Sequence, residues 1–203
     1  MNGAGAAGPQ VAVPSQYRYI TLVPYNAALT VSMLGLVFGS LPGQAESVFW
    51  AFNFITWGIS CVWAHRAISN CLALGATGLR FRPWGAFVAM LIPIANLYFG
   101  YRIFQEVWVN NFGATKSEPS GLIKIWWRLF VWSFAAGILL GFVGLALTMG
   151  AGVPDRSVVQ VLNSVGLLLL LVQWSAAGLY IAISWKIGSR FEAGRNRRMT
   201  MHV

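Results

Sequence analysis

The sequence predicts an all-α protein that lies in a membrane. The predicted architecture is a polytopic helix bundle with four transmembrane helices and a proline-broken third apolar segment that is re-entrant or interfacial. Of its 203 residues, 57% are hydrophobic and only 9% are charged, whereas soluble domains contain about 25% charged residues. Five apolar segments follow one another, and a run of about 20 apolar residues is long enough to cross a bilayer. Lys and Arg gather at the ends of these segments, as the positive-inside rule expects.

The composition changes at both ends of the chain. Residues 1–16 are rich in Gly, Ala and Pro and carry no charge, which predicts a disordered tail because such a segment cannot build a packed core. Residues 17–190 form the predicted membrane helical domain. Residues 191–203 are strongly basic and are predicted to form a cytoplasmic tail.

The first apolar segment covers residues 20–41, with Pro24 in its first turns and Pro42 directly after it. Proline is tolerated at the start of a helix and ends one elsewhere. Gly35 and Gly39 are four residues apart, which lets a second helix approach closely. We interpret this pair as a contact within the chain, in preference to a dimer face.

The second apolar segment covers residues 47–74 and is apolar as far as Val62. A helix starting at residue 47 reaches Arg66 after about 28 Å, which nearly matches a hydrocarbon core of ~30 Å. We therefore expect Arg66 near the membrane boundary, where its long side chain can extend to the headgroups.

The third apolar segment, residues 84–99, is short for a membrane span, at about 24 Å as a straight helix. Pro93 lies within it and lacks a backbone N–H, so the helix is predicted to kink or break there. Asn96 is well placed to bond the backbone groups that such a break leaves unpaired. An amphipathic helical pattern then continues to Trp108.

The fourth and fifth apolar segments cover residues 129–149 and 158–187. Both contain small residues at the spacing that permits close helix contact, namely Gly137 and Gly141 in the fourth, Gly178 and Ala182 in the fifth. The fourth is preceded by aromatic and basic residues typical of a membrane interface, namely Lys124, Trp126, Trp127 and Arg128.

The distribution of the 14 Lys and Arg residues distinguishes four spans from five. If the third segment enters and leaves on the cytoplasmic side, every basic residue except Arg156 lies on that side, together with both termini. If all five segments cross, the opposite side receives Arg18, Arg66, Arg80, Arg82 and Arg156. The positive-inside rule therefore favours four spans, with five spans as the alternative.

Most polar residues that adjoin apolar segments collect between residues 63 and 108. Two interpretations of Arg66 stand at this stage. It either extends to lipid headgroups, or holds the third segment by bonding carbonyls near Pro93 or pairing with Glu106, which we favour. The candidate structural or functional cluster is Arg66, Asn70, Asn96, Arg102 and Glu106.

The sequence offers little that an enzyme requires. It has five acidic residues, two His and two Cys, without a zinc-type spacing or a common catalytic motif. Cys61 and Cys71 lie about 15 Å apart along one helix, too far for a disulfide. We predict no catalytic, cofactor or metal site. The net charge of +9 is explained by membrane orientation, so we expect no nucleic-acid partner.

One set of residues forms a pattern that extends from the second apolar segment to the start of the fourth, namely Trp63, Arg66, Asn70, Ala73-Leu74-Gly75, Leu79-Arg80-Phe81, Ile92-Pro93-Ile94-Ala95-Asn96-Leu97, Tyr101, Glu106, Trp108 and Trp126-Trp127. With this pattern, the stretch between residues 47 and 149 resembles a bacterial membrane family known as a domain of unknown function, DUF4328. The resemblance implies a protein of the bacterial cytoplasmic membrane and implies no activity. The sequence departs from the family pattern in two places, at Arg82-Pro83-Trp84-Gly85 and at Gln105.

Two functions remain at this stage. The favoured one is a non-enzymatic membrane protein that anchors, senses or binds a partner or lipid through the hairpin of residues 63–108 on the cytoplasmic face. The alternative is a small transporter or channel subunit with a site at the broken helix around Asn96. Membrane lipids are expected partners, with another protein or a second copy of the chain as further candidates. Asn53, Asn163 and Gln173 are deep polar residues that interhelical hydrogen bonds would explain.

Overall fold

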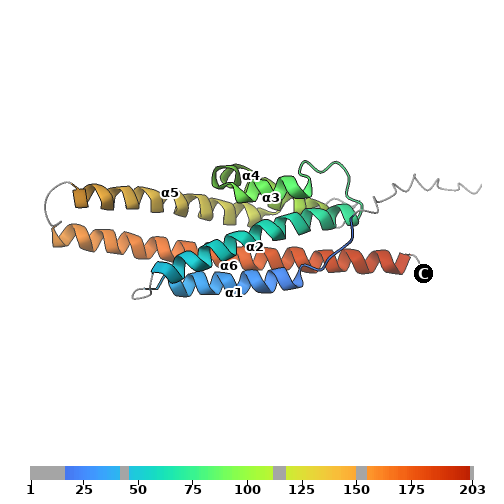
Figure 1. The fold of residues 1–203 in the computed structure, drawn as a ribbon, viewed down its shortest axis with the longest axis horizontal. Helices are drawn as coiled ribbons and strands as arrows, with labels where there is room; N and C mark the ends of the chain where they lie inside the picture. Colours follow the sequence, from blue (N-terminus) through green and yellow to red (C-terminus); the bar gives the residue numbers. More distant parts are fainter. Residues whose placement is uncertain (1–16, 42–45, 112–117, 150–154, 202–203) are drawn as a thin grey trace, which may run out of the picture.

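A computed structural model describes residues 17–41, 46–111, 118–149 and 155–201. Within these ranges all regular secondary structure is helical (Figure 1), which confirms the predicted all-α class. The helices are α1 (Val23–Gly39), α2 (Glu46–Ala73), α3 (Pro83–Leu91), α4 (Pro93–Asn110), α5 (Gly121–Met149) and α6 (Arg156–Met201).

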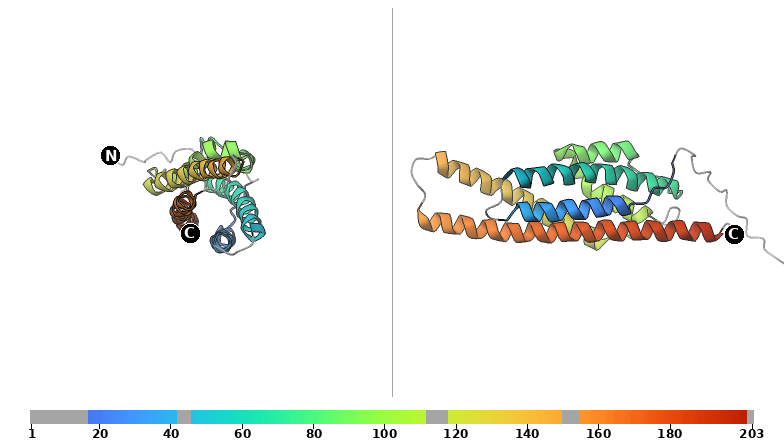
Figure 2. Two further views of the ribbon diagram at one scale, coloured as in Figure 1. Left: turned by 90° about the vertical axis from the view of Figure 1, so that its left-hand side faces the viewer. Right: turned by 60° about the horizontal axis from the view of Figure 1, so that its bottom comes forward.

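Four helices lie side by side along the length of the molecule. Figure 2 shows α1, α2, α5 and α6 running along the length of the molecule, with α3 and α4 against the outer side. The start of α1, the end of α2 and the end of α6 lie toward the same end, and the other ends of α5 and α6 extend beyond α1 and α2 (Figure 1).

Three helices, α2, α5 and α6, are long and apolar enough to cross a membrane, and α1 is a shorter apolar helix of 17 residues. The length of α6, 46 residues, corresponds to about 69 Å. This is more than twice the ~30 Å hydrocarbon thickness, so α6 must extend beyond a bilayer that it crosses. Helix α6 continues past residue 190 as far as Met201, and Phe191 is fully buried in the core.

The third apolar segment is broken at the predicted place. Helix α3 ends at Leu91, Ile92 is extended (φ −87°, ψ 116°), and Pro93 is the first residue of α4. Proline suits this position because the first helical N–H needs no partner within the helix. With 9 residues, α3 is about 14 Å long, and neither α3 nor α4 is among the helices long and apolar enough to cross a membrane.

The two ends of the α3–α4 unit lie together. A carboxylate oxygen of Glu106, near the end of α4, accepts hydrogen bonds from the backbone N–H groups of Arg80 and Phe81, just before α3. The Phe81 ring also contacts Phe99 edge-on at 5.7 Å. The unit therefore returns to the end of the bundle from which it starts, as a helical hairpin.

An aromatic core joins α2, α4, α5 and α6. Trp63 of α2 stacks on Phe104 of α4 at 4.9 Å, and Phe104 also contacts Trp126 of α5 and Tyr180 of α6. These four side chains are at most 5% exposed. Large aromatic side chains bury much apolar area, so this cluster stabilises the relative positions of four helices.

The predicted small-residue contacts have mixed outcomes. A Cβ atom on Gly35 would overlap the Phe52 ring, and one on Gly39 would lie 3.0 Å from the Phe49 backbone, so this pair packs on α2 as predicted. At Gly137, Gly141 and Gly178 nothing lies within 4 Å of an added Cβ. The close helix contact that their spacing permits is therefore not made at these three positions within the described residues.

Candidate functional site: a groove between the helices

The predicted polar cluster is dispersed over several places. Asn70 is fully buried in α2 and holds residues 17–22, which we call the N-terminal strap. Its side-chain oxygen accepts a hydrogen bond from the Ile20 N–H at 3.0 Å, and its amide group donates to the Ile20 carbonyl at 2.7 Å. This two-way pairing gives Asn70 a structural role.

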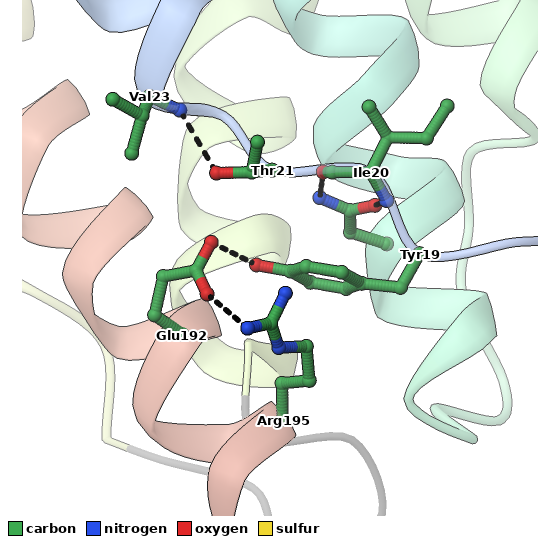
Figure 3. Close-up of polar contacts among 7 residues, drawn as sticks. Tyr19, Ile20, Thr21, Val23, Glu192 and Arg195 are labelled. Carbon is green, nitrogen blue, oxygen red and sulfur yellow. Dashed lines mark hydrogen bonds and ion pairs between the residues drawn. The ribbon is translucent and has the colours of Figure 1, made fainter.

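The strap is fastened to α6 as well. The Tyr19 hydroxyl donates to the Glu192 carboxylate at 2.9 Å, and Glu192 pairs with Arg195 at 3.5 Å (Figure 3). Burial and the bond to Glu192 raise the pKa of Tyr19, so this phenol remains a hydrogen-bond donor. The strap thus connects α2 and α6 at one end of the bundle.

Arg66 and Glu106 do not pair. Glu106 bonds the backbone before α3, and Arg66, half-buried, makes no hydrogen bond or ion pair within the described residues. The other Glu106 oxygen is buried without a partner, and burial raises the pKa of this carboxyl above its ordinary value of 4.5. Arg102 lies over the Tyr98 ring at 4.5 Å and donates to the hydroxyl of this exposed residue.

Asn96 does not cap the broken helix with its side chain, contrary to the prediction. Its backbone N–H bonds the Ile92 carbonyl at 2.8 Å, while its side-chain oxygen lies against Gly100, where a Cβ atom would be only 2.5 Å away. Because the α4 helix itself satisfies the backbone after Pro93, the amide of Asn96 remains available. It lines a groove.

This groove has a volume of about 440 Å³ and is lined by residues of α1, α2, α4, α5 and α6, together with Met90 of α3. Binding sites for small molecules commonly measure about 300–1,000 Å³ and combine apolar walls with few polar groups. Aromatic side chains form much of the wall, among them Trp50, Phe54, Trp57, Trp126, Trp127 and Phe130. Polar side chains in the lining include Asn53, Thr56, Ser60, Asn96, Gln173 and Tyr180.

Some of these polar groups are satisfied within the chain. The Tyr180 hydroxyl donates to Ser60 at 2.8 Å, and the Ser60 hydroxyl donates to the Thr56 carbonyl at 2.7 Å. Ser133, also in the lining, donates to the Phe130 carbonyl at 3.0 Å. The bond between Tyr180 and Ser60 links α6 to α2, and the other two bonds lie within α2 and within α5.

Other polar groups in the lining have no partner. The Thr56 hydroxyl is buried without a hydrogen bond, in a residue that is 6% exposed. No hydrogen bond from the described part of the chain reaches the side chains of Asn53, Asn96 or Gln173. The sequence marked these three amides as notable, but contained no signal for Thr56, whose burial depends on the packing of α2.

The described residues contain no group of three or more His, Cys, Asp or Glu side chains that could hold a metal. Cys61 and Cys71 are buried free thiols.

Comparison with known proteins gives one result. The model of a domain of unknown function, DUF4328, matches residues 41–187. The chain belongs to this family. The DUF4328 match includes α2 to α5 and most of α6, hence most of the groove, whereas the N-terminal strap and Glu192 lie outside it. No curated protein and no solved structure matches the chain.

Proposed function

We propose that this DUF4328 protein is a multi-pass protein of the bacterial cytoplasmic membrane with four spans, α1, α2, α5 and α6. The α3–α4 hairpin enters from the cytoplasmic side, where both termini lie. Three observations support this topology. The four helices run along the same direction, the hairpin returns to the end of the bundle from which it starts, and nearly all Lys and Arg residues would lie on the cytoplasmic side. Exposed apolar residues of the hairpin, among them Trp84, Ile94 and Tyr98, would contact lipid.

In this membrane the protein binds a small molecule within its groove, without catalysing a reaction. The buried, unpartnered hydroxyl of Thr56 is the observation that carries this proposal. A buried polar group without a hydrogen bond costs about 1–3 kcal/mol, and a bilayer supplies no bulk water to satisfy it. A bound molecule would supply the missing partner. We favour binding over catalysis because the polar groups in the groove are amides and hydroxyls. None of these serves as an acid or a base for proton transfer near neutral pH.

Native mass spectrometry tests the binding function. We expect the protein, released from mild detergent or a lipid nanodisc, to retain a molecule of defined mass. The double variant Thr56→Val with Asn96→Leu should lose it, whereas Asn163→Leu, an amide outside this groove, should keep it. A wild-type protein free of bound mass in both preparations would contradict binding.

Cysteine labelling tests the topology. Both native thiols are buried, so background labelling should be low. Thr77→Cys, exposed between α2 and α3, and Asp155→Cys, exposed at the start of α6, mark opposite ends of the bundle. An impermeant reagent added outside intact cells should label residue 155 alone. Labelling of residue 77 from outside would contradict the four-span arrangement.

Transport is a second candidate, favoured by the position of the helix break. Pro93 and Asn96 both line the groove, and transporters often place substrates at interrupted helices. Once the bound molecule is known, its uptake into vesicles containing the protein would be measured. Uptake indistinguishable from that of empty vesicles, with binding intact, would exclude transport.

A further inference from the structure

We infer that the groove binds an uncharged amphiphile: a molecule with hydrogen-bonding oxygens, no net charge and an apolar tail directed into the bilayer. This inference rests on the proposed function and names the chemical class of its ligand.

The first argument concerns charge. Among the residues that the structure describes, no Lys, Arg, Asp or Glu lines the groove. A carboxylate or phosphate placed there would lose its hydration without gaining a cation, and an ammonium group would gain no carboxylate. Burying an isolated charge is much more costly than burying a neutral polar group. The lining therefore discriminates against ionised lipids.

The second argument concerns hydrogen bonding. A hydroxyl such as that of Thr56 can donate one bond and accept two, and each amide offers both donors and acceptors. A ligand hydroxyl or carbonyl oxygen can bond to these groups. A pure hydrocarbon would fill the volume and leave the Thr56 hydroxyl unpaired, so the ligand must carry at least one polar oxygen.

The third argument concerns access. Trp50 and Phe54 of α2 and Phe134 of α5 line the groove, yet are 54%, 62% and 43% exposed. Since α2 and α5 are both helices long and apolar enough to cross a membrane, this exposed aromatic rim would face the acyl chains. A ligand can then enter sideways from the bilayer and leave its apolar tail there.

Tryptophan quenching by a matched pair of probes tests the inference. The probes are a bromine-labelled fatty alcohol and the fatty acid with the same labelled chain, added to the protein in nanodiscs at a pH at which the acid is ionised. Bromine quenches nearby indoles, and the groove contains Trp50, Trp57, Trp126 and Trp127. We expect saturable quenching by the alcohol at a concentration at least ~10-fold lower than that needed for the acid, because the acid alone brings a charge into the groove.

Substitution of Thr56 tests whether the alcohol binds at the unpartnered hydroxyl. Thr56→Val keeps the side-chain shape and should weaken alcohol binding about 10-fold, the equivalent of one lost hydrogen bond. Ser164→Ala removes an exposed α6 hydroxyl outside this groove and should leave binding unchanged. Equal or tighter binding of the acid, no saturable binding of the alcohol, or an unaffected Thr56→Val would each overturn the inference. A charged lipid found in the groove by mass spectrometry would overturn it and leave the binding function standing.

Discussion

Two pairs of asparagine side chains in this protein differ in whether the protein itself satisfies their hydrogen bonds. Asn26 and Asn70 are fully buried, and both ends of each amide are hydrogen-bonded. Asn26 donates to the Ser184 carbonyl at 3.1 Å and accepts from the Trp63 indole at 2.8 Å. Asn53 and Asn96 line the groove, and their side chains have no hydrogen bond within the described part of the chain.

The difference shows that residue type alone does not assign a role to an amide in a membrane bundle. In apolar surroundings an amide is either bonded to the protein or available to something else. The bonded pair holds α1, α2, α6 and the strap together. Asn26 and the strap lie before the DUF4328 match, whereas Asn70 and the available pair lie inside residues 41–187.

The largest expected effect is that of Asn26→Leu. This change leaves the buried Trp63 N–H without its acceptor and removes the hydrogen bond from Asn26 to Ser184 that joins α1 to α6. We expect a loss of about 3 kcal/mol in the free energy of unfolding, measured by denaturant titration in detergent. Asn163→Leu is the control, because Asn163 is exposed, and should change stability little. A loss below ~0.5 kcal/mol for Asn26→Leu would contradict the claim that the hydrogen-bonded amides stabilise the fold.

Next is Asn70→Leu, which releases both backbone groups of Ile20. We expect a loss of about 2 kcal/mol and faster proteolytic cleavage within residues 17–22. Tyr19→Phe removes only the bond to Glu192 at the half-exposed end of the strap, and should cost ~1 kcal/mol or less. A strap that remains protected in Asn70→Leu would show that α6 alone holds it.

A smaller effect concerns pH. Because burial raises the pKa of Glu106 in the folded protein, folding favours its protonated form. The contribution of Glu106 to the unfolding free energy therefore increases as the pH falls through the raised pKa of the folded protein. It becomes constant below the ordinary pKa of 4.5. The difference in unfolding free energy between wild type and Glu106→Gln should follow this curve. A difference that changes in the opposite direction with pH would contradict it.

The smallest expected loss of stability belongs to the groove. Thr56→Val and Asn96→Leu remove no hydrogen bond made by the described chain, so neither should lower the unfolding free energy of ligand-free protein by more than ~0.5 kcal/mol. Thr56→Val should raise it, because the buried hydroxyl has no partner. The same denaturant titration applies. A loss comparable to that of Asn70→Leu would assign these residues to the fold instead of to a ligand.

Local signals predicted much of this architecture. Pro93 broke its helix where expected, because the missing N–H acts within one turn. Gly35 and Gly39 packed on α2, while Gly137 and Gly141 did not, since small residues permit a contact without specifying whether a partner helix is there.

The site required tertiary information. Arg66 was expected to hold the third segment by bonding carbonyls near Pro93 or by pairing with Glu106, and it does neither. The Arg80 and Phe81 amides reach Glu106 instead, because α3–α4 folds back on itself. The groove depends on how α2, α5 and α6 pack around Tyr180. These helices are far apart in the sequence. The buried position of Thr56 is a consequence of that packing.

A crystal structure of the protein grown from a lipid mesophase would test the central claim most directly. The account predicts continuous non-protein density in the groove, with a polar atom about 2.7–3.0 Å from the Thr56 hydroxyl and further polar contacts to Asn53 or Asn96. A closed groove, in which the Thr56 hydroxyl bonds another side chain of this protein, would contradict the account.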